Sequence, residues 1–325
     1  MAQEGIVVEE LVKIYPKEVT AVDGVSFDVS RGEIYGFLGP NGAGKSTVVK
    51  ILTSLGLPTS GKARVGGFDV IEQAAEVRRI AGVTLQDIGI DPLMKPAELL
   101  KLQGQLFGML ASEAEQRAME LISLVGLEEA ADRRVGNFSG GMKRRLDLAM
   151  SLVHKPQILF LDEPTTGLDP ASRRDVWREV RRLNQELGMT IFLTTQYLEE
   201  ADELADRIAI IDQGKIKVIG SPAKLKASLG KESLNLLFDR RETAEEAAGL
   251  VSELAESTAV DRETLILYRE DAAERIPDIL NRLSEGGFAP LSVTLTQPNL
   301  DDVFLHFTGQ SMPGEGNKLP GNEIN

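Results

Sequence analysis

A glycine-rich run near the start of the chain has the residue types and spacing of a phosphate-binding turn. Gly39-Pro40-Asn41-Gly42-Ala43-Gly44-Lys45-Ser46-Thr47 matches the pattern G-x-x-x-x-G-K-[ST]. Glycines let backbone N–H groups turn inward around phosphate oxygens, and the helix expected from Lys45 points its positive dipole end at them. Lys45 is expected to reach the β- and γ-phosphates and Ser46 to coordinate Mg²⁺. The run therefore predicts a nucleoside triphosphate site.

An acidic pair farther along the chain supplies complementary chemistry. Ile158–Leu161 is a fully apolar run, typical of a buried strand in a parallel sheet, and Asp162-Glu163 follows it directly. Parallel α/β sheets bind ligands at the carboxyl ends of their strands. Asp162 is expected to hold Mg²⁺, and Glu163 to act as the general base that polarises the attacking water.

A third motif lies between these two. Ser139-Gly140-Gly141 opens an expected helix, with Ser139 as a natural N-cap and the glycines exposing backbone N–H groups. The glycine-rich run alone would suit a kinase, a GTPase, a motor or a transporter. In their order along the chain, the three motifs resemble the nucleotide-binding domain of ABC proteins, over roughly the first two-thirds of the sequence.

The resemblance implies a fold and a working unit. It implies an α/β P-loop NTPase cassette over 5–230, with a RecA-like core, an antiparallel β subdomain and a helical subdomain at about 88–155. In this family the Ser-Gly-Gly signature binds the γ-phosphate of ATP held by the opposite subunit. Ser139, Gly140 and Gly141 are therefore expected to act in trans, in a dimer with a second copy or a homologous cassette.

Further site residues follow from the resemblance. Tyr15 stands where the family stacks an aromatic ring on adenine. Gln86 resembles the glutamine that touches Mg²⁺ and water, in the loop that leads to the helical subdomain and its membrane partner. Asp169, in Gly167-Leu168-Asp169, resembles the residue that crosses the dimer interface.

One position departs from the common family pattern. Most ABC proteins carry a switch histidine near the γ-phosphate, and Gln196 stands in its place here. Glutamine can hydrogen-bond phosphate or orient water but does not titrate near neutral pH, which leaves Glu163 as the main base. The run from Thr194 to Asp202 and the segment Leu300–Phe304 resemble the daunorubicin/doxorubicin-resistance class of exporter ATPases. That class implies a separate integral-membrane permease and export of a hydrophobic compound, drug or lipid. It also implies that this chain lies peripherally at the cytoplasmic face of the cell membrane.

Periodicity outlines the elements that position these residues. Strand patterns over the cassette alternate with helical patterns, as in α/β domains. The expected strands and helices are Ile6–Ile14, Val19–Val29, Glu33–Leu38, Ser46–Leu55, Ser139–Val153, Ser172–Leu187, Thr190–Thr195 and Arg207–Asp212. Beyond 230 the order β-α-β-β-α-β predicts a small α+β ferredoxin-like module over 231–308, closed by a helix at Asn299–Phe307, and 309–325 is expected to be disordered.

Composition narrows the function classes. The net charge is -14, which disfavours a nucleic acid partner, and the absence of cysteine excludes disulfides and thiol catalysis. No apolar run reaches the roughly 18 residues that span a bilayer. The alternatives left open are a soluble ABC ATPase of the translation or DNA-repair type, and an importer subunit. Neither a second P-loop nor a long coiled coil is visible in the sequence to favour the soluble class.

Several other polar groups have structural interpretations. His154 and His306 lack further ligands at metal-binding spacing and are expected to be structural. Lys143-Arg144-Arg145 is interpreted as a solvated helix face or an interface charge, and Asp301-Asp302 as acids of a first helical turn.

Overall fold

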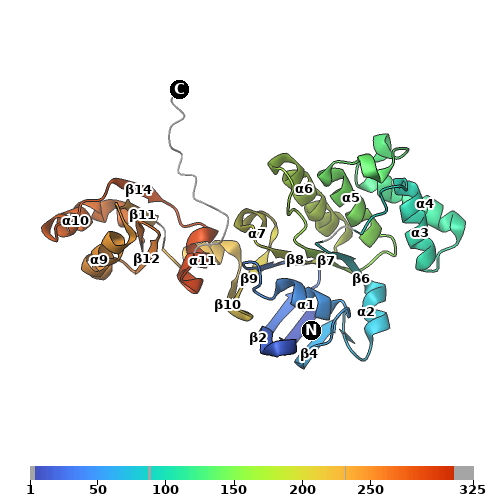
Figure 1. The fold of residues 1–325 in the computed structure, drawn as a ribbon, viewed down its shortest axis with the longest axis horizontal. Coiled ribbons are helices and arrows are strands. Elements are labelled where there is room, and N and C mark those ends of the chain that lie inside the picture. Colours follow the sequence, from blue (N-terminus) through green and yellow to red (C-terminus); the bar gives the residue numbers. More distant parts are fainter. Residues whose placement is uncertain (1–3, 87–88, 231, 311–325) are drawn as a thin grey trace. The chain divides into compact units, whose positions relative to one another are not determined.

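The computed structural model describes residues 4–86, 89–230 and 232–310, and Figure 1 shows its ribbon. The chain divides into two units, Met1–Ile219 and Gly220–Asn325. The first unit ends before the expected boundary at 230, because helix α8 (Pro222–Ala227) packs against the last helix, α11 (Leu300–Thr308). The expected disorder of 309–325 concerns residues that, from 311 on, lie outside the described part of the chain.

The first unit begins with an antiparallel sheet. Its strands follow the spatial order β2-β1-β4-β5. Their bounds are Glu4–Tyr15 (β1), Val19–Ser30 (β2), Ser60–Val65 (β4) and Phe68–Asp69 (β5). A short 3-10 turn, Pro16–Glu18, joins β1 to β2. Along β2 buried and exposed residues alternate, as expected of a strand with one face on the core.

A six-stranded sheet forms the centre of the first unit, in the order β10-β9-β3-β8-β7-β6. Its strands are Ile34–Leu38 (β3), Ala81–Thr84 (β6), Ile158–Asp162 (β7), Thr190–Thr195 (β8), Arg207–Asp212 (β9) and Lys215–Gly220 (β10). From β9 through β6 neighbouring strands pair in parallel. Every residue of β3, β7 and β8 is buried, which explains their continuous apolar runs. Their carboxyl ends share one edge.

Helices surround this sheet. They are Lys45–Leu52 (α1), Ala74–Ile80 (α2), Pro96–Leu106 (α3), Ala111–Leu124 (α4), Gly140–Ser151 (α5), Pro170–Leu187 (α6) and Leu198–Leu204 (α7). Two 3-10 turns, Glu128–Ala130 and Val135–Asn137, lie between α4 and α5. Among the residues that the structure describes, no helix combines the length and apolarity needed to cross a membrane.

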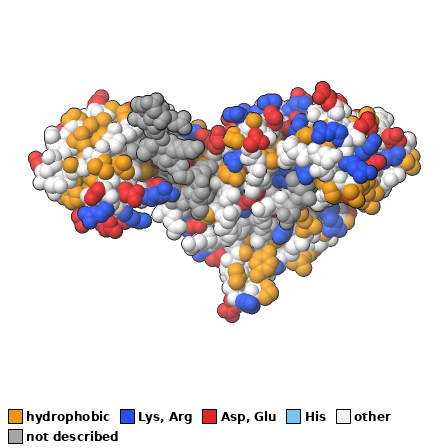
Figure 2. Space-filling model, turned by 45° about the horizontal axis from the view of Figure 1, so that its top comes forward, with side chains coloured by type: hydrophobic (Ala, Val, Ile, Leu, Met, Phe, Trp, Pro, Cys, Tyr) orange, Lys and Arg blue, Asp and Glu red, His pale blue; other side chains and the backbone are white. Residues whose placement is uncertain are grey.

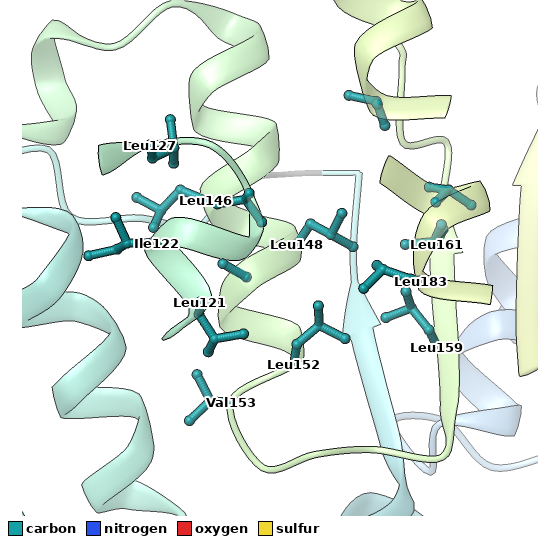
Figure 3. Packing of buried hydrophobic residues seen from close by; sticks show 14 of the residues in the cluster. Leu121, Ile122, Leu127, Leu146, Leu148, Leu152, Val153, Leu159, Leu161 and Leu183 are labelled. Atoms are coloured by element: carbon teal, nitrogen blue, oxygen red, sulfur yellow. The ribbon is translucent and has the colours of Figure 1, made fainter. Parts of the chain in front are cut away.

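Two apolar clusters fix the layers of the first unit. One joins α4, α5 and α6 to β7, and Figure 3 shows Leu121, Leu146 and Leu183 among its members. The other lies between the antiparallel and central sheets. Stacked and tilted rings at centroid separations of 5.4–6.0 Å form its centre, contributed by Phe27, Tyr35, Phe37, Phe160 and Phe192. Such aromatic contacts add about 0.5–1.5 kcal/mol per pair beyond their buried area.

The second unit has the predicted order of elements. Its strands are Glu232–Leu237 (β11), Ser257–Asp261 (β12), Thr264–Arg269 (β13) and Ser292–Thr296 (β14), with helices Arg241–Val251 (α9) and Ala272–Glu285 (α10) and a 3-10 turn at Ser252–Leu254. The sheet order β12-β13-β11-β14, antiparallel throughout, is that of a ferredoxin-like fold. Asp302 lies in the first turn of α11, where its carboxylate accepts a hydrogen bond from the amide of Asn299, the N-cap residue. It also accepts a hydrogen bond from the Tyr268 hydroxyl at 3.0 Å. The interpretation of Asp302 as a first-turn acid is therefore confirmed.

The aromatic cluster leads to a stability prediction. Phe192→Ala removes a fully buried ring from the centre of the cluster, so we expect the first unit to lose about 3–5 kcal/mol of unfolding free energy. The chain's one tryptophan, Trp177, lies in α6 of this unit, so its fluorescence during urea titration reports on the unfolding of the first unit. Leu187→Ala, at a position 58% exposed, is the control and should change stability by about 0.5 kcal/mol or less. Equal effects of the two substitutions would contradict the assigned core.

Candidate nucleotide site

The glycine-rich turn connects the end of β3 to the start of α1, the arrangement expected of a phosphate-binding loop. Gly44 has φ of 105°, a left-handed conformation that favours glycine. A Cβ atom at Gly44 would lie 2.3 Å from the carbonyl oxygen of Ala21, and one at Gly39 would lie 2.3 Å from that of Ile211. The amide of Gly39 also donates to the carbonyl of Thr195 at 3.2 Å, which ties the turn to β8. Only glycine fits these two positions.

Lys45 is buried beneath this turn. Its side chain is 4% exposed, and Nζ donates to the carbonyl oxygens of Gly39 at 2.7 Å and Pro40 at 3.0 Å. Nζ also lies 3.2 Å from Oε1 of Glu163. Burial lowers the pKa of Lys45, and the neighbouring Glu163 carboxylate opposes that shift. The structure thus brings together two residues predicted from motifs far apart in the sequence.

Asp162 ends β7 within a cluster of oxygen atoms. Its Oδ1 accepts hydrogen bonds from the hydroxyl of Ser46 at 3.2 Å and from that of Thr194 at 2.5 Å. Asp162 itself is 2% exposed. A carboxylate and hydroxyl groups are the hard oxygen ligands that Mg²⁺ prefers, so this donor set fits the metal. The contact of Thr194 with Asp162, which is 32 residues away, has no signal in the local sequence.

Glu163 directly follows Asp162 and has an unusual backbone. Its φ is 51°, in a region that non-glycine residues occupy only when their surroundings hold them there. Its amide donates to the backbone carbonyl of Thr194 at 3.0 Å, and Oε2 accepts from the Thr166 hydroxyl at 3.2 Å. The carboxylate is thereby aimed toward Lys45 and the phosphate-binding turn.

Three other predicted residues lie at the ends of strands beside the turn. Tyr15, at the end of β1, is 39% exposed, and its hydroxyl lies 3.5 Å from that of Thr47 in α1. Gln196 is half-buried directly after β8. Gln86 is exposed two residues after β6, and the next two residues lie outside the described part of the chain. Gln86 and Gln196 therefore follow carboxyl ends of the parallel sheet, where α/β sheets bind ligands, whereas Tyr15 approaches Thr47 from the antiparallel sheet.

The Ser-Gly-Gly motif opens α5 rather than joining the phosphate-binding turn. Ser139 caps the helix by accepting from the amide of Met142 at 3.3 Å, and Ser139 and Gly140 are exposed. Asp169 caps α6, accepting from the Ser172 hydroxyl at 2.6 Å. A Cβ atom at Gly141 would lie 2.9 Å from the Ser172 hydroxyl, so the motif and the Asp169 loop are neighbours. Among the described residues, no hydrogen bond joins Ser139 to the turn at 39–47 of its own chain.

The interpretation of Arg144 as a solvated or interface charge was wrong. Arg144 is 4% exposed and donates hydrogen bonds to backbone carbonyls around the nucleotide site. Its neighbour Arg145 donates to the carbonyls of Val125 and Gly126, and is half-buried. The available signal was helical spacing, because Arg144 shares a helix face with the buried Leu148 four residues later.

The remaining polar groups show no metal cluster. His154 is half-buried, lies 3.0 Å from the carbonyl oxygen of Ala81 through Nε2, and stacks on Phe107 at 4.1 Å between centroids. Burial lowers its pKa. No group of three potential His, Cys, Asp or Glu ligands occurs in the described ranges. Figure 2 shows Lys and Arg side chains interspersed with Asp and Glu on the visible face, rather than one continuous basic surface.

Comparisons with known proteins identify the family of the chain. A family model described as ABC transporter matches residues 22–166. The daunorubicin/doxorubicin resistance ATP-binding protein DrrA of Streptomyces peucetius is 46% identical over 301 residues, covering 92% of this chain and 91% of that protein. The chain belongs to the ABC transporter ATP-binding family. A second ABC relative is the linearmycin resistance ATP-binding protein LnrL of Bacillus subtilis (strain 168), which is 36% identical. The aligned region covers 94% of this chain and 98% of that protein.

Solved ABC cassettes share the fold. The dimeric structure of MJ0796, a bacterial ABC transporter cassette, is 27% identical with a TM-score of 0.60, and the match covers 66% of this chain and 98% of that one. Family and fold confirm the predicted α/β P-loop cassette and the resemblance to resistance-type ABC ATPases. This chain is therefore an ATP-binding, ATP-hydrolysing subunit of an ABC transporter of the resistance and export type.

The position of Lys45 leads to a binding prediction. Lys45→Ala removes the buried cation beneath the phosphate-binding turn and leaves the Glu163 carboxylate unpaired, so ATP affinity should fall. A hydrogen bond to a charged group contributes about 1.5–3 kcal/mol, which corresponds to roughly 10- to 100-fold in Kd. Titration with a fluorescent ATP analogue measures the change. Lys50→Ala, at an exposed site on the same helix, is the matched control, and equal affinity of the two variants would rule out the role of Lys45.

Proposed function

We propose that the two predicted catalytic motifs act as one site for ATP hydrolysis. The turn at 39–47 binds the phosphates, Lys45 neutralises their charge, and Ser46 and Asp162 hold Mg²⁺, with Gln86 as a further ligand. Magnesium supplies charge neutralisation for the phosphate oxygens when bound. The single observation that carries this proposal is the buried Lys45–Glu163 contact of 3.2 Å, which puts the base candidate next to the phosphate-binding lysine.

Glu163 is the proposed general base. Its carboxylate accepts a proton from the attacking water as the water oxygen bonds to the γ-phosphorus and the bond to the β–γ bridging oxygen breaks. ADP leaves with the bridging oxygen. Gln196, half-buried after β8, orients water or hydrogen-bonds the γ-phosphate, and Tyr15 stacks on the adenine.

The complete site requires two cassettes. Ser139 and Gly140 are exposed at the N-terminus of α5, where a capped helix end offers N–H groups to an anion. We propose that they bind the γ-phosphate held by an opposite cassette, with Gly141 and Asp169 at the same interface. The relative MJ0796 has been solved as a dimer, in one case bound to ADP and Pi, which supports this arrangement.

The proposed biological role is to power export through a separate permease. Relatives at 36–46% identity are named for resistance to daunorubicin, doxorubicin and linearmycin, which supports a hydrophobic compound, drug or lipid as the cargo. The loop after Gln86 leads into the helical subdomain and is the proposed route to the permease. The cassette would then lie peripherally at the cytoplasmic face of the membrane. The ferredoxin-like module is proposed to assist dimerisation or regulate closure.

Replacing the base tests the chemistry. Glu163→Gln keeps the shape of the side chain but cannot accept a proton, so we expect ATP binding with turnover reduced about 100-fold or more. The trapped ATP should also make the variant accumulate as a dimer in size-exclusion chromatography. Glu199→Gln, exposed in α7, is the control and should turn over normally. Normal turnover by Glu163→Gln would show that another group is the base.

Purification from native membranes tests whether the chain binds the proposed permease. We expect the tagged chain, purified from detergent-solubilised membranes, to retain a multi-span membrane protein in fixed stoichiometry, identified by mass spectrometry. ATPase activity of the purified complex should respond to a hydrophobic drug, whereas the isolated chain should not. Recovery of a soluble dimer with ribosomal or DNA-associated proteins instead would favour the soluble ABC class.

A further inference from the structure

The guanidinium of Arg144 forms an unusual set of contacts inside the first unit. It projects from α5, the helix that begins with the Ser-Gly-Gly motif, and is 4% exposed. Nε donates to the carbonyl of Pro164 at 2.6 Å, Nη2 to that of Asp162 at 3.2 Å, and Nη1 to that of Leu85 at 2.9 Å. Nη1 also donates to Oδ2 of Asp147 at 3.0 Å. One planar side chain therefore connects two separate backbone segments, one around Glu163 and one ending at Gln86, to α5.

The three carbonyls belong to residues next to proposed catalytic groups. Asp162 and Pro164 lie immediately before and after Glu163, and Leu85 immediately precedes Gln86. The Glu163 backbone has φ of 51°, so it needs external support to keep this conformation. Arg144 provides that support through the carbonyls on both sides of Glu163. A side chain with fewer or less rigid donors could not hold the three carbonyls of both segments at once.

A buried carboxylate secures the next residue of the same loop. Glu200 in α7 has no exposed surface, and its Oε1 accepts from the Thr165 hydroxyl and from Trp177 Nε1, each at 2.8 Å. Thr165 directly follows Pro164, whose carbonyl oxygen accepts the hydrogen bond from Arg144 Nε. The loop after Glu163 is thus fixed between α5 and α7, and α7 starts two residues after Gln196.

The charge on Arg144 is supported locally. Burial lowers the pKa of Arg144, whereas the carboxylates of Asp147 and Glu200 raise it. Burial acts in the opposite direction on an acid, because it disfavours the charged form, and it raises the pKa of Asp147 to about 6. A buried cation with a nearby carboxylate and several carbonyl acceptors is satisfied, but removing only one partner would leave an uncompensated charge. Any test of Arg144 must therefore treat Asp147 with it.

We infer that Arg144 is a positioning residue for ATP hydrolysis, which fixes the backbone at Glu163 and Gln86 relative to the helix that carries the Ser-Gly-Gly motif. This inference rests on the proposed role of Glu163 as the base. Under this inference, α5 connects the Ser-Gly-Gly motif to the proposed base. Ser139 lies at the start of the helix, and Arg144 in the following turn binds the backbone on both sides of Glu163 in the same chain. A shift of α5 would therefore also move the carbonyl groups of Asp162 and Pro164, which flank Glu163.

The test separates positioning from folding. Arg144→Met/Asp147→Asn removes both charges of the pair and retains similar volumes, so the fold should survive. We expect kcat for ATP to fall about 100-fold, the scale of effect that a 1 Å misplacement of catalytic groups produces, with KM within about 2-fold of the unmodified chain because the phosphate-binding turn is untouched. Trp177 fluorescence and urea titration check the fold.

A conservative variant and a neighbour provide the comparison. Arg144→Lys keeps the charge but loses the planar fork, so its kcat should lie between those of the double variant and the unmodified chain. Arg145→Met is the matched control, since Arg145 donates to the carbonyls of Val125 and Gly126, away from the loop around Glu163, and it should keep normal kcat. Normal kcat in the double variant, or an equal loss in Arg145→Met, would overturn the inference.

The ATPase activity of Glu163→Gln distinguishes a failure of the positioning role of Arg144 from a failure of the proposed base. If Glu163→Gln is inactive while the Arg144 double variant hydrolyses ATP normally, only the positioning role fails. If Glu163→Gln hydrolyses ATP normally, the base assignment fails and the positioning role fails with it, whatever the Arg144 variants do.

Discussion

The site depends on two opposite charges, Lys45 and Glu163, held 3.2 Å apart with almost no exposure to solvent. Burying each ion costs several kcal/mol unless it is paired and hydrogen-bonded. The carbonyls of Gly39 and Pro40 complete the shell of the lysine, and the Thr166 hydroxyl binds the carboxylate. These contacts require the glycine-rich turn and the end of β7 to meet, and β8, between β3 and β7, sets their separation. The order of strands β3, β8 and β7 in the sheet is therefore required to bring Lys45 and Glu163 into contact.

The same constraint extends to α5 through Arg144. Glu163 is tied to β8 by its amide, and the carbonyls on both sides of it are tied to α5 by one guanidinium. The end of α5 that would meet a second cassette and the loop that carries the base therefore belong to one hydrogen-bonded body. In such a body, the proposed docking of Ser139 on a partner's phosphate would be coupled by geometry to the alignment of Glu163 in its own site. The hydrogen bonds of Arg144 explain why a charged residue is buried on the same helix as Leu146, Leu148 and Ala149.

The motifs and most elements could be predicted from the sequence because their causes are local. A phosphate-binding turn needs glycines and a lysine within nine residues, and apolar runs such as that before Asp162 indicate buried parallel strands. Arg144 was missed because its backbone acceptors lie 18, 20 and 59 residues away, and its local signal, the helical spacing from the buried Leu148, does not reveal those contacts. The support from Thr194 was missed for the same reason. The division at 219 also depends on a distant contact, between α8 and α11.

Mixing two inactive variants tests most directly whether each site is shared between two chains. One chain carries Lys45→Ala, which disables its phosphate-binding turn, and the other carries Ser139→Arg, which blocks its Ser-Gly-Gly motif. If the motif acts in trans, a mixed dimer contains one site with both defects and one intact site, so an equal mixture should recover roughly a quarter of the unmodified ATPase rate. A mixture of Lys45→Ala with the Lys45→Ala/Ser139→Arg double variant should recover none. Absence of recovery in the first mixture, with mixed dimers shown to form, would contradict the account.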